Sequence, residues 1–119
     1  MRNCSSTRLT KRSVEIATKA ITYIDRNYDQ PITQESLSYD FNVPVRILQA
    51  AFQKLVNASV HKYLEKKRLE AAMTMLEDEE ISIKEIYTKV GYSSQSHFGE
   101  FFKKHTGITP AQYRIRKTA

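Results

Sequence analysis

The stretch ITQESLSYDFNV, residues 32–43, is matched 49 residues further along the chain by ISIKEIYTKVGY, residues 81–92. Both segments place a hydroxyl residue, Thr33 or Ser82, where it can cap the N-terminus of a helix. Near its end each has a residue that readily takes the left-handed backbone conformation, Asn42 or Gly91. A short helix followed by such a sharp turn is typical of a helix-turn-helix unit.

The likeness continues through the segment after each turn, with one more residue added to the offset. Phe52 then corresponds to Phe102, so apolar positions match as well. The exchange of Asn for Gly recurs at Asn57 and Gly107, where a left-handed residue is favoured after the last helical turn. Matched caps, turns and apolar positions over roughly thirty residues indicate two copies of one unit.

Helices are expected along the rest of the chain as well. Apolar residues recur mostly at three- and four-residue spacing, and only three glycines and three prolines interrupt the sequence. We therefore predict an all-α fold of seven helices. With N-caps at Ser13, Thr33, Ser59, Ser82 and Thr109 and a first-turn proline at Pro44, the helices are expected at about 14–28, 34–41, 44–56, 60–76, 83–90, 94–105 and 110–116.

The expected domain covers 13–116 and follows a flexible polar segment at 1–12. In a helix-turn-helix protein the second helix of the pair lies in the major groove of DNA. The helices at about 44–56 and 94–105 are the candidates for this role, and we call them the recognition helices. The domain is expected to consist of unit one at about 13–58, a long linker helix at about 60–76 and unit two at about 81–116.

Size and composition narrow the class of protein. The chain has 119 residues and a net charge of +6, from 19 lysines and arginines against 13 acidic residues. This length favours one domain over a multidomain enzyme, and the positive surplus favours a polyanionic partner. A single cysteine, Cys4, excludes a disulfide framework and a cysteine-based zinc site. No apolar run approaches the roughly 20 residues that span a bilayer, so we expect a soluble, cytoplasmic protein.

No catalytic constellation competes with nucleic-acid binding. His61, His97 and His105 lack the spacing of metal ligands, and the acidic run at 77–80 is contiguous rather than a placed pair of carboxylates. We therefore expect no enzyme, no metal and no cofactor. A helical protein-interaction module is the remaining alternative, with the acidic run facing a basic partner. That reading leaves the doubled turn pattern unexplained.

The first recognition helix has two clear candidates for base contacts. Arginine can donate two hydrogen bonds to guanine, and glutamine can pair with adenine, in the major groove. Arg46 and Gln49 are therefore the candidates, with ordinary solvated side chains as the alternative. The periodicity places Ile47, Leu48, Ala51, Phe52 and Leu55 on the inward face, and Val45, Arg46, Gln49, Ala50 and Gln53 on the outward face.

In the second recognition helix the phenylalanines form the inward face, and the best candidate for a base contact is Gln95. Gly99 is unusual because glycine in a helix interior costs roughly 1 kcal/mol relative to alanine, unless something approaches that face closely. Glu100 either accepts a hydrogen bond from a cytosine amino group or repels phosphate. The inward residues are Phe98, Phe101 and Phe102, and the outward residues are Gln95, Ser96, Gly99 and Glu100.

Phosphate contacts are expected from basic residues near the recognition helices and the C-terminus, and from helix N-termini, whose free amides attract anions. A linker helix of about 17 residues would be about 26 Å long, and major grooves on one face of DNA repeat every ~34 Å. We therefore expect one chain to contact two successive grooves. The phosphate candidates are Thr33, Lys54, Ser82, Lys103, Lys104, Arg114 and Arg116.

The second repeat, IKEIYTKVGYSSQSHFGEFFKKHTGITPAQYR at 83–114, resembles the signature of the AraC/XylS family of bacterial transcription regulators. The first repeat is similar through 32–43 and LQAAF at 48–52, and the likeness covers about 13–116. The positions that carry it are Ile86, Val90, Gly91, Tyr92, Ser94, Phe98, Phe102, Lys103, Lys104, Gly107, Thr109, Pro110, Tyr113 and Arg114 in the second repeat, and Tyr63, Arg68, Leu69, Ala72 and Leu76 in the linker helix.

The resemblance implies a seven-helix DNA-binding domain that activates, or sometimes represses, promoters by contacting operator DNA and RNA polymerase. Ala50 and Glu100 stand where arginine is common in the family, and Tyr87 replaces a usual alanine. Because one change removes a donor and another adds negative charge, we expect the first unit to dominate specificity. By matching positions, base contacts fall on Arg46, Gln49 and Ala50, and on Gln95, Ser96, Gly99 and Glu100.

Family members usually carry a separate ligand-sensing or dimerising domain, often N-terminal to the DNA-binding domain. Residues 1–12 are too few and too polar to form one. We therefore expect either a stand-alone regulator controlled by its abundance or the C-terminal portion of a longer chain, associated in both cases with the nucleoid.

Overall fold

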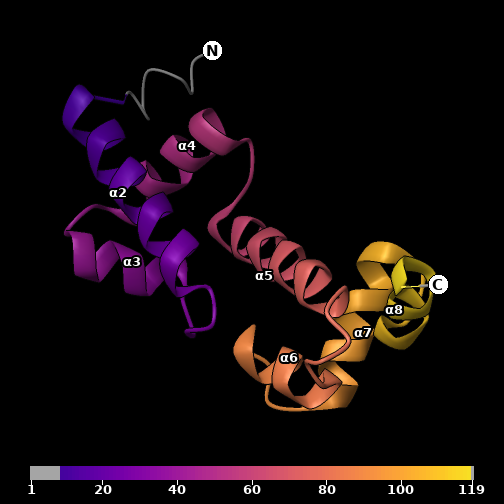
Figure 1. Ribbon diagram of the computed structural model, residues 1–119. Coiled ribbons are helices and arrows are strands. Elements are labelled where there is room, and N and C mark those ends of the chain that lie inside the picture. Colours follow the sequence, from indigo (N-terminus) through magenta and orange to yellow (C-terminus); the bar gives the residue numbers. More distant parts are fainter. Residues whose placement is uncertain (1–8, 119) are drawn as a thin grey trace. The chain divides into compact units, whose positions relative to one another are not determined.

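The computed structural model describes residues 9–118, and seven α-helices account for most of this range (Figure 1). No residue between 9 and 118 lies in a strand, so the prediction of an all-α fold is confirmed. None of the described helices is long and apolar enough to cross a bilayer. The helices are α2 Lys11–Asn27, α3 Gln34–Phe41, α4 Val45–Val56, α5 Val60–Leu76, α6 Ile83–Lys89, α7 Gln95–Thr106 and α8 Pro110–Thr118.

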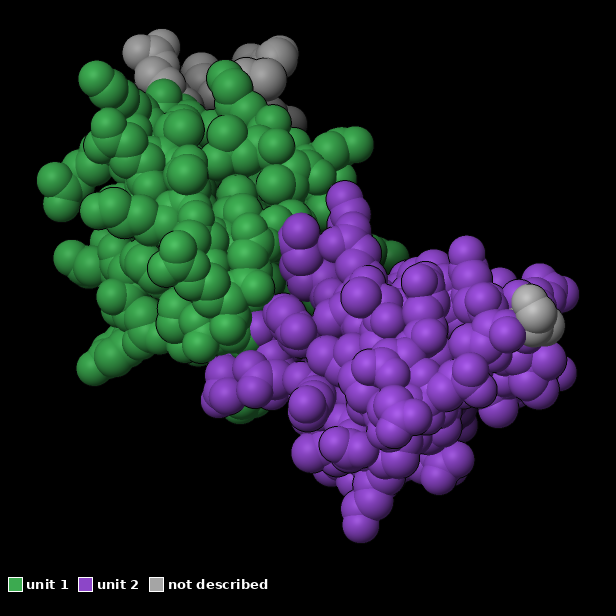
Figure 2. Space-filling view, in the orientation of Figure 1, with its two compact units in different colours: residues 1–27, 31–65 green, residues 28–30, 66–119 purple. Residues whose placement is uncertain are grey.

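The chain divides into two compact units, which Figure 2 shows in different colours. Unit 1 holds the residues up to Asn27 together with Pro31–Glu65. Unit 2 holds Tyr28–Gln30 and the residues from Lys66 onward. The division falls inside α5 instead of at its two ends, so the expected linker helix belongs partly to each unit.

Both parts of α5 contribute buried side chains. Val60, Tyr63 and Leu64 lie in its unit 1 portion, whereas Ala72 and Leu76 lie in its unit 2 portion, and all five are buried. A helix that only bridged two bodies would be polar on every side. The segment at 60–76 is therefore a packed element of both units.

The core of unit 1 is formed by α2, α3 and α4 with the start of α5. The rings of Phe52 and Tyr63 meet edge to face with their centroids 6.1 Å apart. The Tyr63 hydroxyl donates to the Asp25 carboxylate at 2.7 Å, which gives this largely buried side chain a polar partner. The main buried residues of the unit are Ala17, Ala20, Ile24, Leu37, Leu48, Ala51, Phe52, Val60, Tyr63 and Leu64.

The first described helix starts earlier than expected. α2 begins at Lys11, because Thr10 rather than Ser13 provides the cap: the Ser13 amide donates to Thr10 Oγ1 at 3.0 Å. The predicted N-cap at Ser13 was wrong, and so was the flexible segment as far as Lys11 and Arg12 are concerned. Residues 1–8 of that segment, and Cys4 with them, lie outside the described residues.

The turns of the internal repeat are confirmed in the backbone. Four described residues have positive φ, and they are the two matched Asn and Gly pairs: Asn42 at 51° with Gly91 at 97°, and Asn57 at 53° with Gly107 at 85°. Left-handed backbone is tolerated best by glycine and asparagine. The same two chain reversals therefore occur at matching positions in each unit.

Most helix boundaries follow the predicted caps. The Thr33 hydroxyl accepts from the Ser36 amide, and the Ser82 hydroxyl accepts from the Glu85 amide, each as part of a capping box. Pro44 differs from the prediction, because its ψ of 142° places it just before α4 instead of in the first turn. α8 continues to Thr118, two residues beyond the expected end.

The core of unit 2 is built from the second part of α5 and from α6, α7 and α8. Tyr92 stacks on Phe101 with ring centroids 5.0 Å apart, and the rings of Phe102 and Tyr113 meet edge to face at 5.5 Å. The three phenylalanines of α7 are thus core residues, as predicted. The buried residues of this core are Ala72, Leu76, Ile86, Val90, Phe98, Phe101, Phe102 and Tyr113.

Arg68 holds residues 28–30 within unit 2. Its Nε donates to the carbonyl of Tyr28 at 2.6 Å and its Nη2 donates to the carbonyl of Gln30 at 2.9 Å. The guanidinium also lies over the ring of Tyr92, 5.4 Å from the centroid. This side chain supplies hydrogen-bond donors to carbonyls of a turn that lacks helical partners.

Candidate nucleic-acid interface

Helix α4 presents the expected outward face. Leu48, Ala51 and Phe52 are buried, whereas Arg46 and Gln49 are exposed on the other side. Both polar side chains lie in the first half of the helix, which follows the left-handed turn at Asn42. In a helix-turn-helix unit this is the part that meets base edges.

Of the predicted inward residues of α4, Ile47 is half-buried and Leu55 is exposed. Leu55 is 39% exposed, although its position in the helical period points to the core side. The matching residue of the second unit, His105, is exposed too. In both units the last turn of the recognition helix therefore has an exposed residue at this matched position.

Gln49 is connected to the neighbouring helix. Its Nε2 donates to Oε1 of Gln34, the first residue of α3, at 2.9 Å. Sequence reasoning did not single out Gln34, whose only signal is its place directly after the cap Thr33. The contact joins residues that are 15 positions apart, and it appears only when α3 packs on α4.

Helix α7 also places its candidate residues outward. Gln95, Ser96 and Glu100 are exposed and Gly99 is half-buried. A Cβ atom built on Gly99 would meet no atom within 4 Å outside its chain neighbours and the nearby backbone of α7. The glycine therefore leaves open space beside α7, and no described part of the chain itself requires it.

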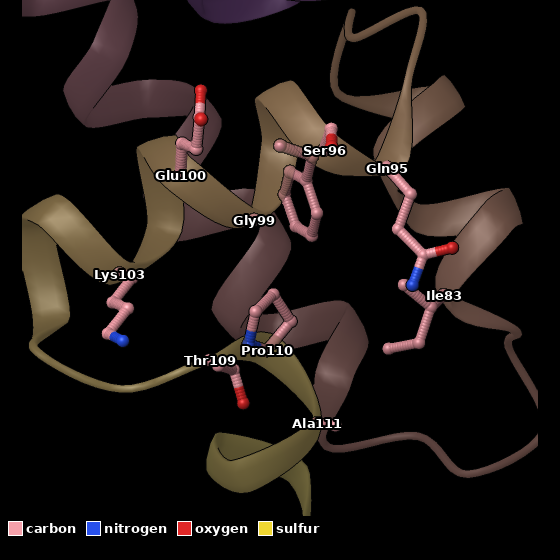
Figure 3. Close-up of a pocket in the computed structure, with 10 residues that line it drawn as sticks. Ile83, Gln95, Ser96, Gly99, Glu100, Lys103, Thr109, Pro110 and Ala111 are labelled. Carbon is pink, nitrogen blue, oxygen red and sulfur yellow. The ribbon is translucent and has the colours of Figure 1, made fainter.

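This open space is part of a cavity of about 590 Å³, which we call the α7 groove (Figure 3). In Figure 3 the Lys103 side chain points toward the end of the groove where Thr109 lies, whereas the Glu100 side chain points away from Pro110. The groove thus brings the outward face of α7 beside the starts of α6 and α8. Its lining residues are Ile83 from α6, Gln95, Ser96, Phe98, Gly99, Glu100 and Lys103 from α7, and Thr109, Pro110 and Ala111 at the start of α8.

Unit 1 has a cavity at the corresponding place. Its volume is about 390 Å³, and it lies between the start of α3, at Thr33, Gln34 and Glu35, and the start of α5, at Ser59 and His61. The repeat pairs α3 with α6 and α5 with α8. In both units the cavity therefore lies beside the first turns of two helices.

Four of the predicted phosphate contacts are exposed cations in the last turns of their helices. Lys54 lies in the last turn of α4, Lys103 and Lys104 lie in the last turn of α7, and Arg116 lies in the last turn of α8. Cations are favourable at the C-terminus of a helix because they complement its dipole. These charges remain accessible to solvent and to a ligand.

Arg114, a predicted phosphate contact, has a different role. Its Nε donates to the carbonyl of Leu76 at 3.0 Å, and its Nη2 donates to the carbonyls of Asp78 and Ile81 at 3.1 and 2.6 Å. The half-buried guanidinium closes the C-terminus of α5 and the turn that follows it. These bonds engage Nε and Nη2 of the guanidinium in holding the fold, so we do not retain Arg114 among the proposed phosphate contacts.

Ser82 is also a poor anion site in this structure. The Glu85 carboxylate Oε1 lies 3.3 Å from the Ser82 amide and 3.4 Å from its hydroxyl. A phosphate at this end of α6 would meet that negative charge. At Thr33 the corresponding partner is the neutral side chain of Ser36, whose Oγ accepts from the Thr33 amide at 3.0 Å. The nearest acidic residue of that turn, Glu35, bonds to Gln34 instead of to the cap.

The histidines do not form a metal site. Between residues 9 and 118 no group of three or more His, Cys, Asp and Glu side chains could hold a metal ion. His61 instead faces Glu65, one turn later in α5, with its Nε2 3.4 Å from the carboxylate.

Comparison with known proteins identifies the family. The model of a helix-turn-helix domain family matches residues 37–116, which is more than half of the chain. The uncharacterized HTH-type transcriptional regulator YijO of Escherichia coli K12 is 33% identical over 92 residues, 77% of this chain and 32% of that protein. The chain spans about a third of the length of the curated relatives that it matches.

Solved structures share the fold over nearly the whole chain. The C-terminal domain of AraT, a response regulator from Geobacillus stearothermophilus, matches with a TM-score of 0.82 and 33% identity over 94% of this chain and 90% of that chain. A Chromobacterium violaceum transcriptional regulator, described as AraC-type, gives a TM-score of 0.75 and 27% identity over 91% and 96%. Together with the duplicated helix-turn-helix pattern, these matches show that the chain belongs to the AraC family of DNA-binding transcription regulators.

Proposed function

We propose that this chain binds double-stranded promoter DNA sequence-specifically, with α4 and α7 in successive major grooves. The observation that carries the proposal is the outward face of α4. Arg46 and Gln49 are exposed there, directly after the turn at Asn42, while the opposite face of the helix is buried. These side chains have the donor and acceptor patterns that match guanine and adenine.

The first unit supplies the stronger base contacts in this proposal. Arg46 donates to guanine, Gln49 pairs with adenine, and the methyl group of Ala50 offers an apolar contact to thymine. In the second unit Gln95 is the main candidate, with Ser96, Gly99 and Glu100 beside it. Because Glu100 brings a negative charge to that face, α7 contributes less discrimination than α4.

Phosphate contacts position the domain on the duplex. We propose Lys54, Lys103, Lys104 and Arg116 for this role because they are exposed cations near the ends of α4, α7 and α8. We propose Thr33 as a further phosphate contact, because it caps the N-terminus of α3, where backbone amides attract anions. Such contacts raise the affinity for every sequence and carry no base information.

Two further features of the proposal concern the site and the outcome of binding. Helix α5 has 17 residues, about 26 Å, and successive major grooves on one face of DNA lie ~34 Å apart. This length supports contact with two grooves by one chain.

As the family resemblance implies, we propose that binding activates a promoter through contact with RNA polymerase.

Selection from random duplex DNA at moderate salt tests the proposal. The expected result is an enriched, non-palindromic motif whose footprint covers about two helical turns. Failure to enrich any motif would refute sequence-specific binding. A motif confined to one turn would refute the two-groove arrangement but not the base contacts of α4. A reporter gene placed behind the selected site tests activation, and a lower signal than the empty promoter would indicate repression instead.

A further inference from the structure

Three side chains form a hydrogen-bonded chain from the start of α3 to the outer face of α4, all within unit 1. Gln34 Nε2 donates to the Glu35 carboxylate at 3.1 Å. Gln49 Nε2 donates to Gln34 Oε1 at 2.9 Å. The proposed base contact Gln49 is thus held by a neighbour that is itself held by a carboxylate.

The chemistry of the first member sets the direction of the whole chain. An ionised carboxylate can only accept hydrogen bonds, so Gln34 must turn its amide nitrogen toward Glu35. Its carbonyl oxygen then faces Gln49 and can only accept. Gln49 must therefore present its own nitrogen to Gln34, which determines an amide orientation that a free glutamine side chain leaves open.

The bond to Gln34 also changes what Gln49 can offer to a base. One of its two N–H groups is used, which leaves one N–H donor and the carbonyl oxygen. Adenine presents one acceptor and one donor in the major groove, and guanine presents two acceptors. A free glutamine could turn both N–H groups to guanine, whereas the held side chain fits adenine better.

We infer that Gln34, oriented by Glu35, is a positioning residue that selects adenine through Gln49. The inference rests on the proposed function, since it assumes that α4 contacts bases. Both hydrogen bonds are exposed in the free protein, and they strengthen when DNA excludes water from the interface. Holding Gln49 in advance also reduces the entropy lost when the long side chain is ordered on DNA.

The test measures dissociation constants for duplexes that carry each of the four bases at one pair of the selected site. Gln49→Ala first identifies the pair, as the one where the base preference is lost. Gln34→Leu is then expected to reduce the preference for adenine over guanine at that pair by about two- to tenfold, the effect of losing one hydrogen bond. The preference at the pair contacted by Arg46 is expected to stay unchanged.

Two further variants separate positioning from a structural effect. Gln53→Leu makes the same exchange at an exposed site of α4, and we expect it to leave the preference at the Gln49 pair unchanged. Gln34→Glu keeps an acceptor for Gln49 but adds a negative charge near DNA. We expect it to lower the affinity for all four duplexes while retaining adenine, and this result remains informative if Gln34→Leu does not fold.

Three results would contradict the positioning role of Gln34. If Gln34→Leu lowers the affinity for all four bases equally, Gln34 has only a structural or phosphate-binding role and the inference is wrong. The inference is also wrong if Gln49→Ala changes no base preference, or if Gln34→Glu loses adenine selectivity as completely as Gln49→Ala. In all these cases the unaltered protein still prefers one sequence, so the proposed function survives. Absence of any sequence preference in the unaltered protein would instead overturn both.

Discussion

At the scale of single residues, Arg46 and Lys104 are exposed cations with different expected roles. Arg46→Ala should cost about 1–3 kcal/mol of binding free energy on the preferred site and relax the preference at one base pair. Lys104→Ala should weaken binding to all sequences about equally, because a phosphate contact carries no base information. Dissociation constants on a panel of single-base variants of the selected site distinguish the two. Equal loss across the panel for Arg46→Ala would move this residue to the phosphate contacts.

Arg114 and Arg116 form a second matched pair, two residues apart in α8. Arg114→Ala removes the guanidinium donors from the carbonyls of Leu76, Asp78 and Ile81, and of these the Asp78 carbonyl keeps the Ile81 amide as a donor. We expect the free energy of unfolding, measured with urea, to fall by about 1–3 kcal/mol. Arg116 is exposed, so Arg116→Ala should change stability by less than about 0.5 kcal/mol while weakening DNA binding.

The opposite pattern would restore the prediction made from the sequence. If Arg114→Ala folded with unchanged stability and lost as much DNA affinity as Arg116→Ala, its guanidinium would be a phosphate contact in solution. Arg114→Lys offers a further control. A compact ammonium cannot reproduce the fork that bonds several carbonyls at once, so lysine should recover only part of the lost stability.

At the scale of the helix and its turn, the three glycines should respond differently to alanine. Gly99 lies inside α7 with open space around its Cβ position, so Gly99→Ala should raise the free energy of unfolding by up to about 1 kcal/mol. Gly107 has φ of 85° and Gly91 has φ of 97°, a conformation that is strained for alanine by about 1–2 kcal/mol. Thermal and urea unfolding of the three variants provide the measurement.

The turn glycines should also differ from each other. A Cβ on Gly91 would lie 2.9 Å from Arg68 Cζ and 3.0 Å from the carbonyl of Asp29, whereas a Cβ on Gly107 would meet nothing within 4 Å. Gly91→Ala is therefore expected to be the more destabilising of the two. A stabilising Gly91→Ala would mean that the turn between α6 and α7 relaxes freely. Reduced DNA affinity in a stabilised Gly99→Ala variant would show that DNA approaches α7 at this glycine.

At the scale of the whole molecule, the net charge of +6 should appear in the salt dependence of DNA binding. Neutralising a phosphate contributes about −0.9 to the slope of log affinity against log salt concentration. The four cations proposed as phosphate contacts predict a slope of about −3.6, and Lys104→Ala should make it about 0.9 less steep. Equilibrium titrations between low and moderate salt measure both slopes. A slope near zero would contradict a phosphate-based interface.

Much of this architecture could be predicted from the sequence, because its signals are local. The caps Thr33 and Ser82 bond to amides three residues away. Asn42 and Gly91 take the left-handed conformation because asparagine tolerates it and glycine has no Cβ atom. Apolar periodicity within one helix likewise identified the buried faces of α4 and α7. The duplicated helix-turn-helix pattern follows from these short-range rules.

The tertiary structure decided which polar side chains remain available for a ligand. Arg114 bonds to carbonyls 33 to 38 residues away, and Gln49 bonds to a glutamine 15 residues earlier. Leu55 is 39% exposed although the helical period places it on the inward face. Composition and spacing determined the helices, the turns and the family resemblance. The partners of a long polar side chain depend instead on which carbonyls and carboxylates the fold brings within hydrogen-bond distance, and no local pattern specifies them.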